Sequence, residues 1–540
     1  MQLTQNHINQ ILQNLNLGQI EKGLQLAKNL LNTNKDNLQL NKLVAYIYSM
    51  KEQNHLSIDI LRKIKKKFPQ DFDVSNNLGY NYLNEEKVSL ALENINDAIK
   101  INPHDPTPYK NLAEIYLLLR NFDKAESAIN LCLEKIAKQV NSSLHLSNIV
   151  RLKVQIFLAK NERVSAIDFL KINLNQNFDP ELLFELVNVD RDTITNDILN
   201  KAKSLIKDNI YSSHLDRLNK LSPLLFFLAK YYEKNDQSLS EEYYNQANTE
   251  VKNIQRLKVI VFQKRFKSIM NSYNSIKDLE GSSPQRGTGN LFIVGMPRSG
   301  TSLLESVVTA NSQVFPGGEL KAMNRLYDIF EESPNTNLIE KIDDMGREYS
   351  DITSEIKGAH DYIVDKMPLN ATLIGFILKA LPNAKIILIL RNPWDIAISL
   401  YKQRYVQNIT FAASFFNIGV YMANFEAIVN FWLNHPSIKN KIYKLKYEDL
   451  VNNFDLEQKS IYQFCEISSP YQQKVRESHF VRTASMNQVQ GKIHKESIKK
   501  NAFENGHKEF LDAYYSQAEY WKSLGPSITY NFFGYFGQKG

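Results

Sequence analysis

The spacing of apolar residues changes near the middle of the chain. Up to about residue 250, apolar positions recur at the three- and four-residue intervals of amphipathic helices. From Leu291 onward, short β-rich runs alternate with helical stretches, which is typical of a parallel α/β sheet. The predicted strands are 291–295, 361–365, 384–390 and 442–447, and the predicted crossover helices are roughly 300–311, 370–381, 393–405 and 412–434.

An internal repeat is visible in the helical half. Two sets of apolar and small residues match at an interval of 34 positions: Leu78, Gly79, Tyr82, Ala91 and Ala98, and then Leu112, Ala113, Tyr116, Ala125 and Cys132. This pattern resembles the tetratricopeptide repeat, in which small residues let antiparallel helices pack closely. We therefore expect a helical solenoid, which either binds a peptide or partner or only supports the second half.

The boundary between the halves is marked by composition. Gly, Ser and Pro cluster in "GSSPQRGTGN", residues 281–290, as they do in linkers. The predicted organisation is helical repeats over 1–250, a connecting helix and linker over 251–289, and an α/β domain over 290–540.

Composition and charge exclude several classes of protein. A chain of 540 residues with 43% hydrophobic and 23% charged residues fits two or three globular domains. A net charge of +7 without a basic stripe argues against nucleic-acid binding. The two cysteines are far apart, no signal peptide begins the sequence, and no apolar run approaches the ~20 residues of a membrane span. We therefore expect a cytoplasmic protein.

The first predicted strand leads into a glycine-rich turn, "LFIVGMPRSGTSLLE". Gly295 and Gly300 have the spacing of the phosphate-binding P-loop, but Thr301 stands where that loop carries its lysine. Backbone N–H groups at the start of the following helix favour an anion. The Arg298 guanidinium and the hydroxyls of Thr301 and Ser302 add donors.

The missing lysine disfavours a nucleoside triphosphate. In kinases and ATPases that lysine reaches the β- and γ-phosphates, and an acidic residue at a strand end holds magnesium. Here the strand 384–390 is followed by Arg391. Asp365 does end a strand, so a P-loop kinase or ATPase remains the alternative. The loop suits a single phosphate with an attached group better.

Six segments together carry a family resemblance. They are "VGMPRSGTSLLE", "PGGEL", "DKMPLN", "PNAKIILILRNPWDIAISLY", "YEDLV" and "VRTASMNQVQ". In this order, over residues 290–525, they look like sulfotransferases that use 3′-phosphoadenylyl sulfate, and most like the subgroup that joins tetratricopeptide repeats to a domain similar to tyrosylprotein sulfotransferases. The resemblance implies a P-loop-like fold, no metal, and transfer of a sulfuryl group to a hydroxyl or amine. It does not identify the acceptor, which could be peptide tyrosine, a carbohydrate, a lipid or a small metabolite.

The resemblance also implies the residues that bind the donor. Arg391 and Ser399 match the pair that grips the 3′-phosphate, and their spacing lets both face one anion. Tyr447 and Ser485 fall in motifs of the nucleotide pocket. Lys500 could reach the 3′-phosphate, although Asn501 stands where the family has a tryptophan in its C-terminal lid. The loop that binds the 5′-phosphate and bridging sulfate corresponds to Arg298, Ser299, Gly300, Thr301 and Ser302.

Three residues match catalytic positions. Glu319 in "PGGEL", expected early in a helix, matches the general base, and Lys366 matches the lysine that supports the leaving phosphate; Arg298 is the third. The alternatives are that Glu319 is a helix-terminal charge and Lys366 a surface lysine. His360 is a less favoured base, and Asp395 is interpreted as a helix-terminal charge. A repeat scaffold with an inactive catalytic half is disfavoured by the joint presence of Arg298, Glu319, Lys366, Arg391 and Ser399.

Overall fold

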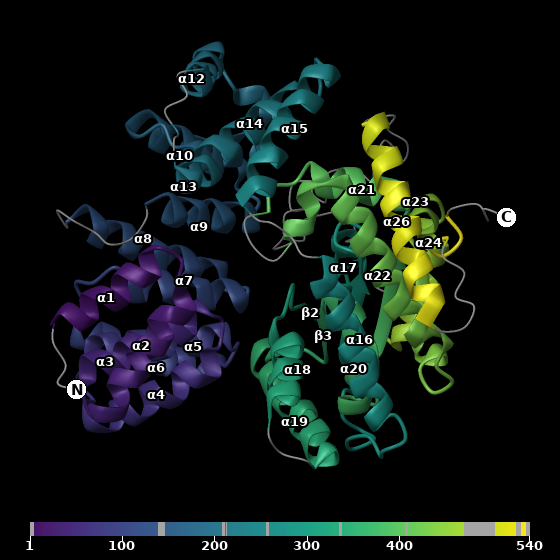
Figure 1. Cartoon of the computed structure of the whole chain (residues 1–540), viewed down its shortest axis with the longest axis horizontal. Helices are drawn as coiled ribbons and strands as arrows, with labels where there is room; N and C mark the ends of the chain where they lie inside the picture. Colours follow the sequence, from purple (N-terminus) through teal and green to yellow (C-terminus); the bar gives the residue numbers. More distant parts are fainter. Residues whose placement is uncertain are drawn as a thin grey trace. The chain divides into compact units, whose positions relative to one another are not determined.

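A computed structural model describes residues 5–138, 146–207, 211, 213–254, 259–333, 337–405, 409–468, 503–524 and 531–535. The chain divides into two compact units (Figure 1). The first comprises Met1–Ile156 with Asp351–Gly358, and the second Phe157–Ser350 with Ala359–Gly540. The domain limits at 250 and 289 stay predictions.

The first unit contains antiparallel helical pairs. Small residues set their close approach, as the repeat predicts: a Cβ on Gly79 would lie 2.6 Å from the Ile95 side chain, and Ala91, Ala98, Ala113 and Ala125 are fully buried. The helices are α1 (Gln5–Asn16), α2 (Ile20–Thr33), α3 (Leu38–Met50), α4 (Asn54–Lys67), α5 (Phe72–Asn84), α6 (Val88–Ile101), α7 (Thr107–Leu118) and α8 (Phe122–Ala137).

A second group of helices precedes the sheet, and α11 and α15 of this group make contacts within the second unit to residues that follow β4 (Lys385–Leu390). Glu181 of α11 forms an ion pair of 2.7 Å with Arg404, whose side chain is 4% exposed. The Asn248 side-chain amide on α15 donates to the Tyr401 carbonyl at 2.8 Å. The group consists of α9 (Leu146–Ala159), α10 (Arg163–Gln176), α11 (Pro180–Val189), α12 (Asn196–Lys207), α13 (His214–Asp216), α14 (Ser222–Tyr232), α15 (Gln237–Ile254) and α16 (Val259–Ile276).

Replacing Tyr273 of α16 by alanine is expected to destabilise the second unit by about 3–5 kcal/mol, the range for large buried aromatics. The Tyr273 ring is 1% exposed and meets the Trp432 ring edge-on at 4.9 Å. Val261→Ala on the same helix removes a side chain that is 57% exposed, so it should change little. Urea unfolding of both variants checks this, and equal effects would show that α16 is not part of this core.

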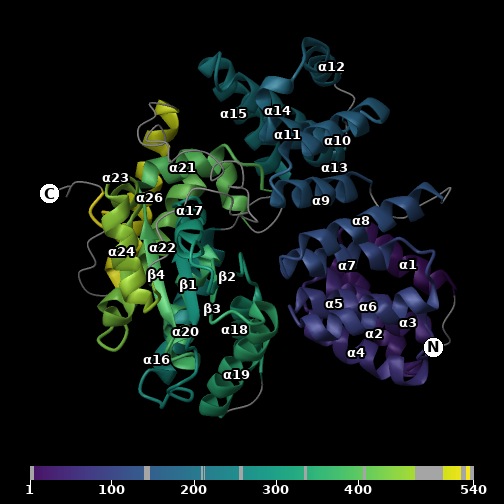
Figure 2. The ribbon, with the colours of Figure 1, turned by 180° about the vertical axis from the view of Figure 1, so that it is seen from behind.

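The second unit is built around a five-stranded sheet. Its order is β2-β3-β1-β4-β5, and every neighbouring pair is parallel. Strands β1 to β4 are labelled in Figure 2. The four predicted strands are present, and a short strand after α17 was not predicted. The strands are β1 (Asn290–Gly295), β2 (Val314–Pro316), β3 (Tyr362–Asp365), β4 (Lys385–Leu390) and β5 (Ile442–Lys446).

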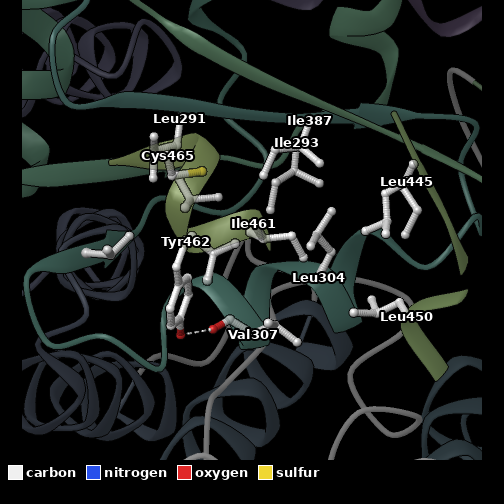
Figure 3. Close-up of a cluster of buried hydrophobic side chains, with 14 of the residues drawn as sticks. Leu291, Ile293, Leu304, Val307, Ile387, Leu445, Leu450, Ile461, Tyr462 and Cys465 are labelled. Carbon is white, nitrogen blue, oxygen red and sulfur yellow. Dashed lines mark hydrogen bonds between the residues drawn. The ribbon is translucent and has the colours of Figure 1, made fainter. Parts of the chain in front are cut away.

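Alternating residues of the central strands divide between two buried faces. Leu291 and Ile293 of β1 join a cluster with Leu304 and Ile461 of the covering helices (Figure 3). In the same cluster the Tyr462 hydroxyl donates to the Val307 carbonyl at 2.7 Å. On the other face, Phe292 stacks on Tyr349 with the ring centroids 5.4 Å apart. Burial on both faces explains why strands β1 and β4 lack polar alternation.

The helices of this domain begin and end as follows: α17 (Thr301–Val308), α18 (Ala322–Glu332), α19 (Leu338–Lys357), α20 (Ile374–Ala380), α21 (Pro393–Tyr401), α22 (Phe415–Asn434), α23 (Tyr447–Asn452), α24 (Phe454–Cys465) and α26 (Glu504–Leu524). Helices α22 and α26 lie side by side (Figure 1). In the part of the chain that the structure describes, none of the helices has both the length and the apolar character that crossing a membrane requires.

A buried carboxyl group on α22 makes the stability of the second unit depend on pH. Burial raises the pKa of Glu426 from 4.5 to about 7, against the opposing hydrogen bond from Tyr514. The folded state therefore holds a proton that the unfolded state has lost, and the free energy of unfolding should fall by a few kcal/mol as pH rises from 4.5 through 7. Glu426→Gln cannot ionise and should flatten this slope in pH-dependent unfolding, unlike the exposed control Glu519→Gln. An unchanged slope in the first variant would contradict the assignment.

Candidate active site

The glycine-rich turn after β1 has the backbone geometry of an anion-binding loop. Arg298 and Gly300 both have positive φ, of 72° and 101°. Gly300 is the N-cap of α17, so the free N–H groups at the start of that helix face the loop. Thr301 and Ser302 occupy the first positions of the helix and are each 5% exposed.

The two glycines of the loop are needed for close packing. A Cβ on Gly295 would lie 2.5 Å from the Ile389 carbonyl oxygen, and one on Gly300 would lie 2.3 Å from the Tyr447 ring. Tyr447 begins α23, directly after β5. The loop therefore lies against the ends of both β4 and β5, at the carboxyl edge of the sheet where ligands bind in parallel folds.

The residues predicted to hold the two ends of a nucleotide are in direct contact. The Arg298 Nε atom donates to the Ser399 hydroxyl at 2.9 Å, and Arg391 Nη1 donates to the Arg298 carbonyl at 3.2 Å. The Arg391 guanidinium lies over the Tyr447 ring, 4.5 Å from its centroid. Helix α21 brings Ser399 to this position two turns after Arg391, as the spacing predicts.

Electrostatics at this cluster favour a bound anion. Burial lowers the pKa of Arg298, and the neighbouring charge of Arg391 lowers it further. Two cationic groups brought together in a partly buried site are stabilised when a negative group lies between them. Planar guanidinium groups match the oxygens of phosphate or sulfate.

Glu319 and Lys366 form an ion pair beside the loop. Their Oε1 and Nζ atoms are 2.8 Å apart. The Lys366 side chain is fully buried, whereas the Glu319 side chain is 40% exposed. The structure therefore excludes a surface role for Lys366, and it leaves one carboxylate open to an incoming group.

The Gly-Gly turn that carries Glu319 is fixed by three contacts. Gly317 N donates to the Val364 carbonyl at 2.9 Å and Lys366 N to the Gly318 carbonyl at 2.7 Å. Gly318 N donates to the Glu305 carboxylate on α17 at 3.1 Å. The prediction that Glu319 lies early in a helix is wrong, because α18 begins only at Ala322. The helix-terminal explanation for this carboxylate therefore loses its basis.

Other polar residues have structural explanations. Asp365 is 1% exposed and accepts hydrogen bonds from the Tyr349 hydroxyl at 2.8 Å, the Met367 N–H at 3.0 Å and the Asn370 amide at 3.1 Å. A carboxylate so engaged is a poor magnesium ligand, which weakens the ATPase alternative. Asp395 lies in the first turn of α21, as predicted.

The remaining predicted residues fall into two groups: His360 and Ser299, which the structure describes, and three others that lie outside the described residues. His360 precedes β3, at the strand end opposite Lys366, and its ring contacts Phe315. Ser299 is fully buried, and its hydroxyl has no hydrogen-bond partner among the described residues. Ser485, Lys500 and Asn501 lie outside the described residues.

One residue near the reacting centre was missed in the sequence. Tyr405 is partly buried, and burial raises the pKa of its hydroxyl to about 12, with the charges of Arg298 and Glu319 acting on it in opposite directions. It therefore lies within electrostatic reach of both. The buried Arg404–Glu181 ion pair anchors the preceding residue. No local sequence pattern marks Tyr405.

Comparison with solved structures gives weak likenesses. A sulfotransferase domain from the curacin biosynthetic pathway shares 19% identity and a TM-score of 0.26, covering 45% of this chain and 94% of that domain. A thermophilic tetratricopeptide-repeat protein of Thermus thermophilus shares 18% identity and a TM-score of 0.30, covering 34% of this chain and 97% of that protein. Scores this low carry no argument about function.

Comparison of sequences is more informative. An uncharacterized protein of Aquifex aeolicus (strain VF5) is 31% identical over 231 residues, which are 39% of this chain and 30% of that protein. This chain therefore spans less than a third of that relative's length. The model of the sulfotransferase family matches residues 290–471, which include β1 to β5, the loop after β1 and the Glu319–Lys366 pair. Residues 290–471 form a domain of the sulfotransferase family.

Proposed function

We propose that the chain transfers a sulfuryl group from 3′-phosphoadenylyl sulfate to a hydroxyl or amine acceptor. The observation that carries this proposal is the contact of Arg298 with both Ser399 and Arg391. It joins a loop suited to a 5′-phosphate to a cationic pair suited to a second phosphate. A P-loop ATPase has no use for that second anion site, and it needs the loop lysine that is absent here.

The proposed reaction follows from the placement of Glu319. The acceptor oxygen or nitrogen attacks sulfur in line, a new bond to sulfur forms, and the bond between sulfur and the bridging phosphate oxygen breaks. The acceptor proton passes to the exposed Glu319 carboxylate, and 3′,5′-phosphoadenosine leaves with the bond electrons. Thr301, Ser302 and the N–H groups of α17 would hold the phosphate on which negative charge develops.

The ion pair couples the two halves of this reaction. While Glu319 is ionised, its charge is balanced by Lys366 at 2.8 Å. When Glu319 takes up the acceptor proton, that balance is lost and the Lys366 charge becomes available to the departing phosphate. Proton transfer and leaving-group stabilisation would thus occur together, with no need for a metal.

We further propose different roles for the two sets of helices. Helices α11, α15 and α16 support the catalytic domain through buried contacts such as those of Arg404 and Tyr273. Helices α1–α8 are then available to bind the acceptor or another partner, for example a peptide or protein. If α1–α8 bind the acceptor, a protein acceptor should turn over faster than its isolated acceptor group. An excess of a fragment that contains α1–α8 should compete for the protein acceptor and remove this advantage.

Thermal stability tests the donor assignment. A ligand at ~100 times its Kd stabilises a protein by ~2.7 kcal/mol, which raises the Tm by several degrees. We expect 3′,5′-phosphoadenosine to raise the Tm, and ATP with magnesium to raise it much less. A response to ATP with magnesium alone would reject the sulfotransferase proposal in favour of the kinase or ATPase alternative. Binding of 3′,5′-phosphoadenosine without transfer to any acceptor class would favour an inactive scaffold.

Arg391→Ala is expected to weaken the binding of 3′,5′-phosphoadenosine by roughly ten- to a hundredfold, because a hydrogen bond to a charged group contributes ~1.5–3 kcal/mol. Affinity for adenosine 5′-monophosphate, which has no 3′-phosphate, should change little. Arg325→Ala is the control, since Arg325 is also a partly buried arginine but pairs with Glu348 and lies on α18. Calorimetry on both nucleotides measures the effect, and parallel losses would place Arg391 away from the 3′-phosphate.

A further inference from the structure

The aromatic segment near the end of the chain forms a turn that is fixed to two helices. Phe532 N donates to the Tyr514 hydroxyl of α26 and Phe533 N to the Glu426 carboxylate of α22, each at 3.0 Å. The Tyr514 hydroxyl in turn donates to Glu426. The Phe532 side chain is 1% exposed. We call residues 531–535 the aromatic turn.

The backbone of the aromatic turn is held in an unfavourable conformation. Phe532, Phe533 and Gly534 have φ values of 47°, 56° and 94°. Large side chains rarely adopt positive φ, and such residues persist only where surrounding contacts require them. The contacts to Glu426 and Tyr514 supply that requirement. The turn is therefore a specific structure, although its composition alone suggests only apolar packing.

The aromatic turn places the Tyr535 hydroxyl at the carboxyl edge of the sheet, where the predicted nucleotide site lies. Tyr535 donates to Glu448 Oε2, and the other oxygen of Glu448 accepts from the Asn392 N–H at 3.0 Å. Asn392 follows Arg391 and caps α21. Glu448 follows Tyr447, whose ring lies under the Arg391 guanidinium. One carboxylate thus bridges the aromatic turn and the peptide that carries Arg391.

We propose that Tyr535 and Glu448 are positioning residues for the 3′-phosphate side of the nucleotide site, an inference that rests on the proposed function. Glu448 holds the Arg391–Asn392 peptide, and Tyr535 holds Glu448. The Tyr535 hydroxyl keeps the Glu448 carboxylate turned toward Asn392. A carboxylate that was free to rotate would approach the Arg391 guanidinium and compete with a phosphate for it. The Lys446 ammonium, 5.0 Å from the centre of the Tyr535 ring, adds a second contact that holds the ring.

The ratio of affinities for 3′,5′-phosphoadenosine and adenosine 5′-monophosphate tests this role in the full chain. Tyr535→Phe keeps the ring but removes the donor, and we expect this ratio to fall about tenfold, the worth of one charge-assisted hydrogen bond. The KM for 3′-phosphoadenylyl sulfate should rise, with kcat nearly unchanged. Glu448→Ala should lower the ratio similarly, whereas Glu448→Gln should retain most of it, since an amide still accepts from Asn392. Tyr520→Phe, on α26 and 37% exposed, is the matched control.

The outcomes separate this inference from the function it rests on. A wild-type ratio near one rejects the proposed function and the inference with it. A wild-type preference that Tyr535→Phe retains in full, even with a lower Tm, overturns the inference alone, because the turn would then be structural. A preference lost in Tyr535→Phe and kept in Tyr520→Phe supports it.

Discussion

Glu319→Gln is expected to lower kcat by roughly 10²–10⁴ while the donor still binds, because a positioned base contributes that much to a reaction with proton transfer. Glutamine keeps the size of the side chain and an oxygen that can accept from Lys366, but it cannot take up the acceptor proton. The donor KM should therefore stay close to that of the wild type. Steady-state and single-turnover rates of sulfuryl transfer measure the effect.

A matched control separates the loss of a base from the loss of an ion pair. Glu348 is also a partly exposed glutamate paired with a cation, Arg325 at 3.1 Å. Glu348→Gln should transfer at nearly the wild-type rate. If Glu319→Gln also does so with saturating donor, Glu319 is not the base, and His360 cannot readily replace it because it lies at the other end of β3.

Lys366→Met is expected to lower kcat by roughly 10²–10³, since one preorganised group that stabilises developing charge is worth ~2.7–4 kcal/mol. Methionine fills the volume of the buried lysine stem, so the variant tests charge more than packing. The control is Lys385→Met, which removes a lysine paired with Glu466 at 2.6 Å at the opposite end of β4. Equal kcat values in wild type and Lys366→Met would contradict a role for Lys366 in the reaction.

The effects of the Glu319→Gln and Lys366→Met substitutions on the activation free energy of transfer should not be additive. If proton transfer to Glu319 frees the charge of Lys366, the double variant Glu319→Gln/Lys366→Met should lose little more than the worse single variant. If the factors by which the two single substitutions lower kcat instead multiply in the double variant, the two residues act independently. Proton transfer to Glu319 would then not be coupled to the charge of Lys366.

The sequence predicted the elements whose signals are local. Strands β1, β3, β4 and β5 were each visible as apolar runs, and the loop after β1 as a glycine pattern. Strand β2 was missed because Val314–Pro316 has only three residues and ends in proline. Glu319 was placed in a helix because the turn before it resembles a helix start. Backbone hydrogen bonds to the residues around the end of β3 instead continue up to Gly318, and α18 begins only at Ala322.

The parts that the sequence could not predict depend on contacts between distant residues. The apolar periodicity of the region that forms α10–α15 predicts helices but carries no clear repeat signature, and it does not reveal that ion pairs such as Glu181–Arg404 join this region to the domain that contains the sheet. Arg404, the residue before Tyr405, is held by the same contact. Tyr535 reaches Glu448 across 87 positions of the chain. Periodicity reports which face of a helix is buried, and it does not report what covers that face.

Calorimetric titration of the wild-type chain with 3′,5′-phosphoadenosine and with adenosine 5′-monophosphate tests the central claim most directly. The two ligands differ by the 3′-phosphate, the group assigned to Arg391 and Ser399. The account predicts that 3′,5′-phosphoadenosine binds at least tenfold more tightly, with one site per chain and without magnesium, which corresponds to about 1.4 kcal/mol or more. Equal affinities for the two nucleotides, or binding that requires magnesium, would contradict it.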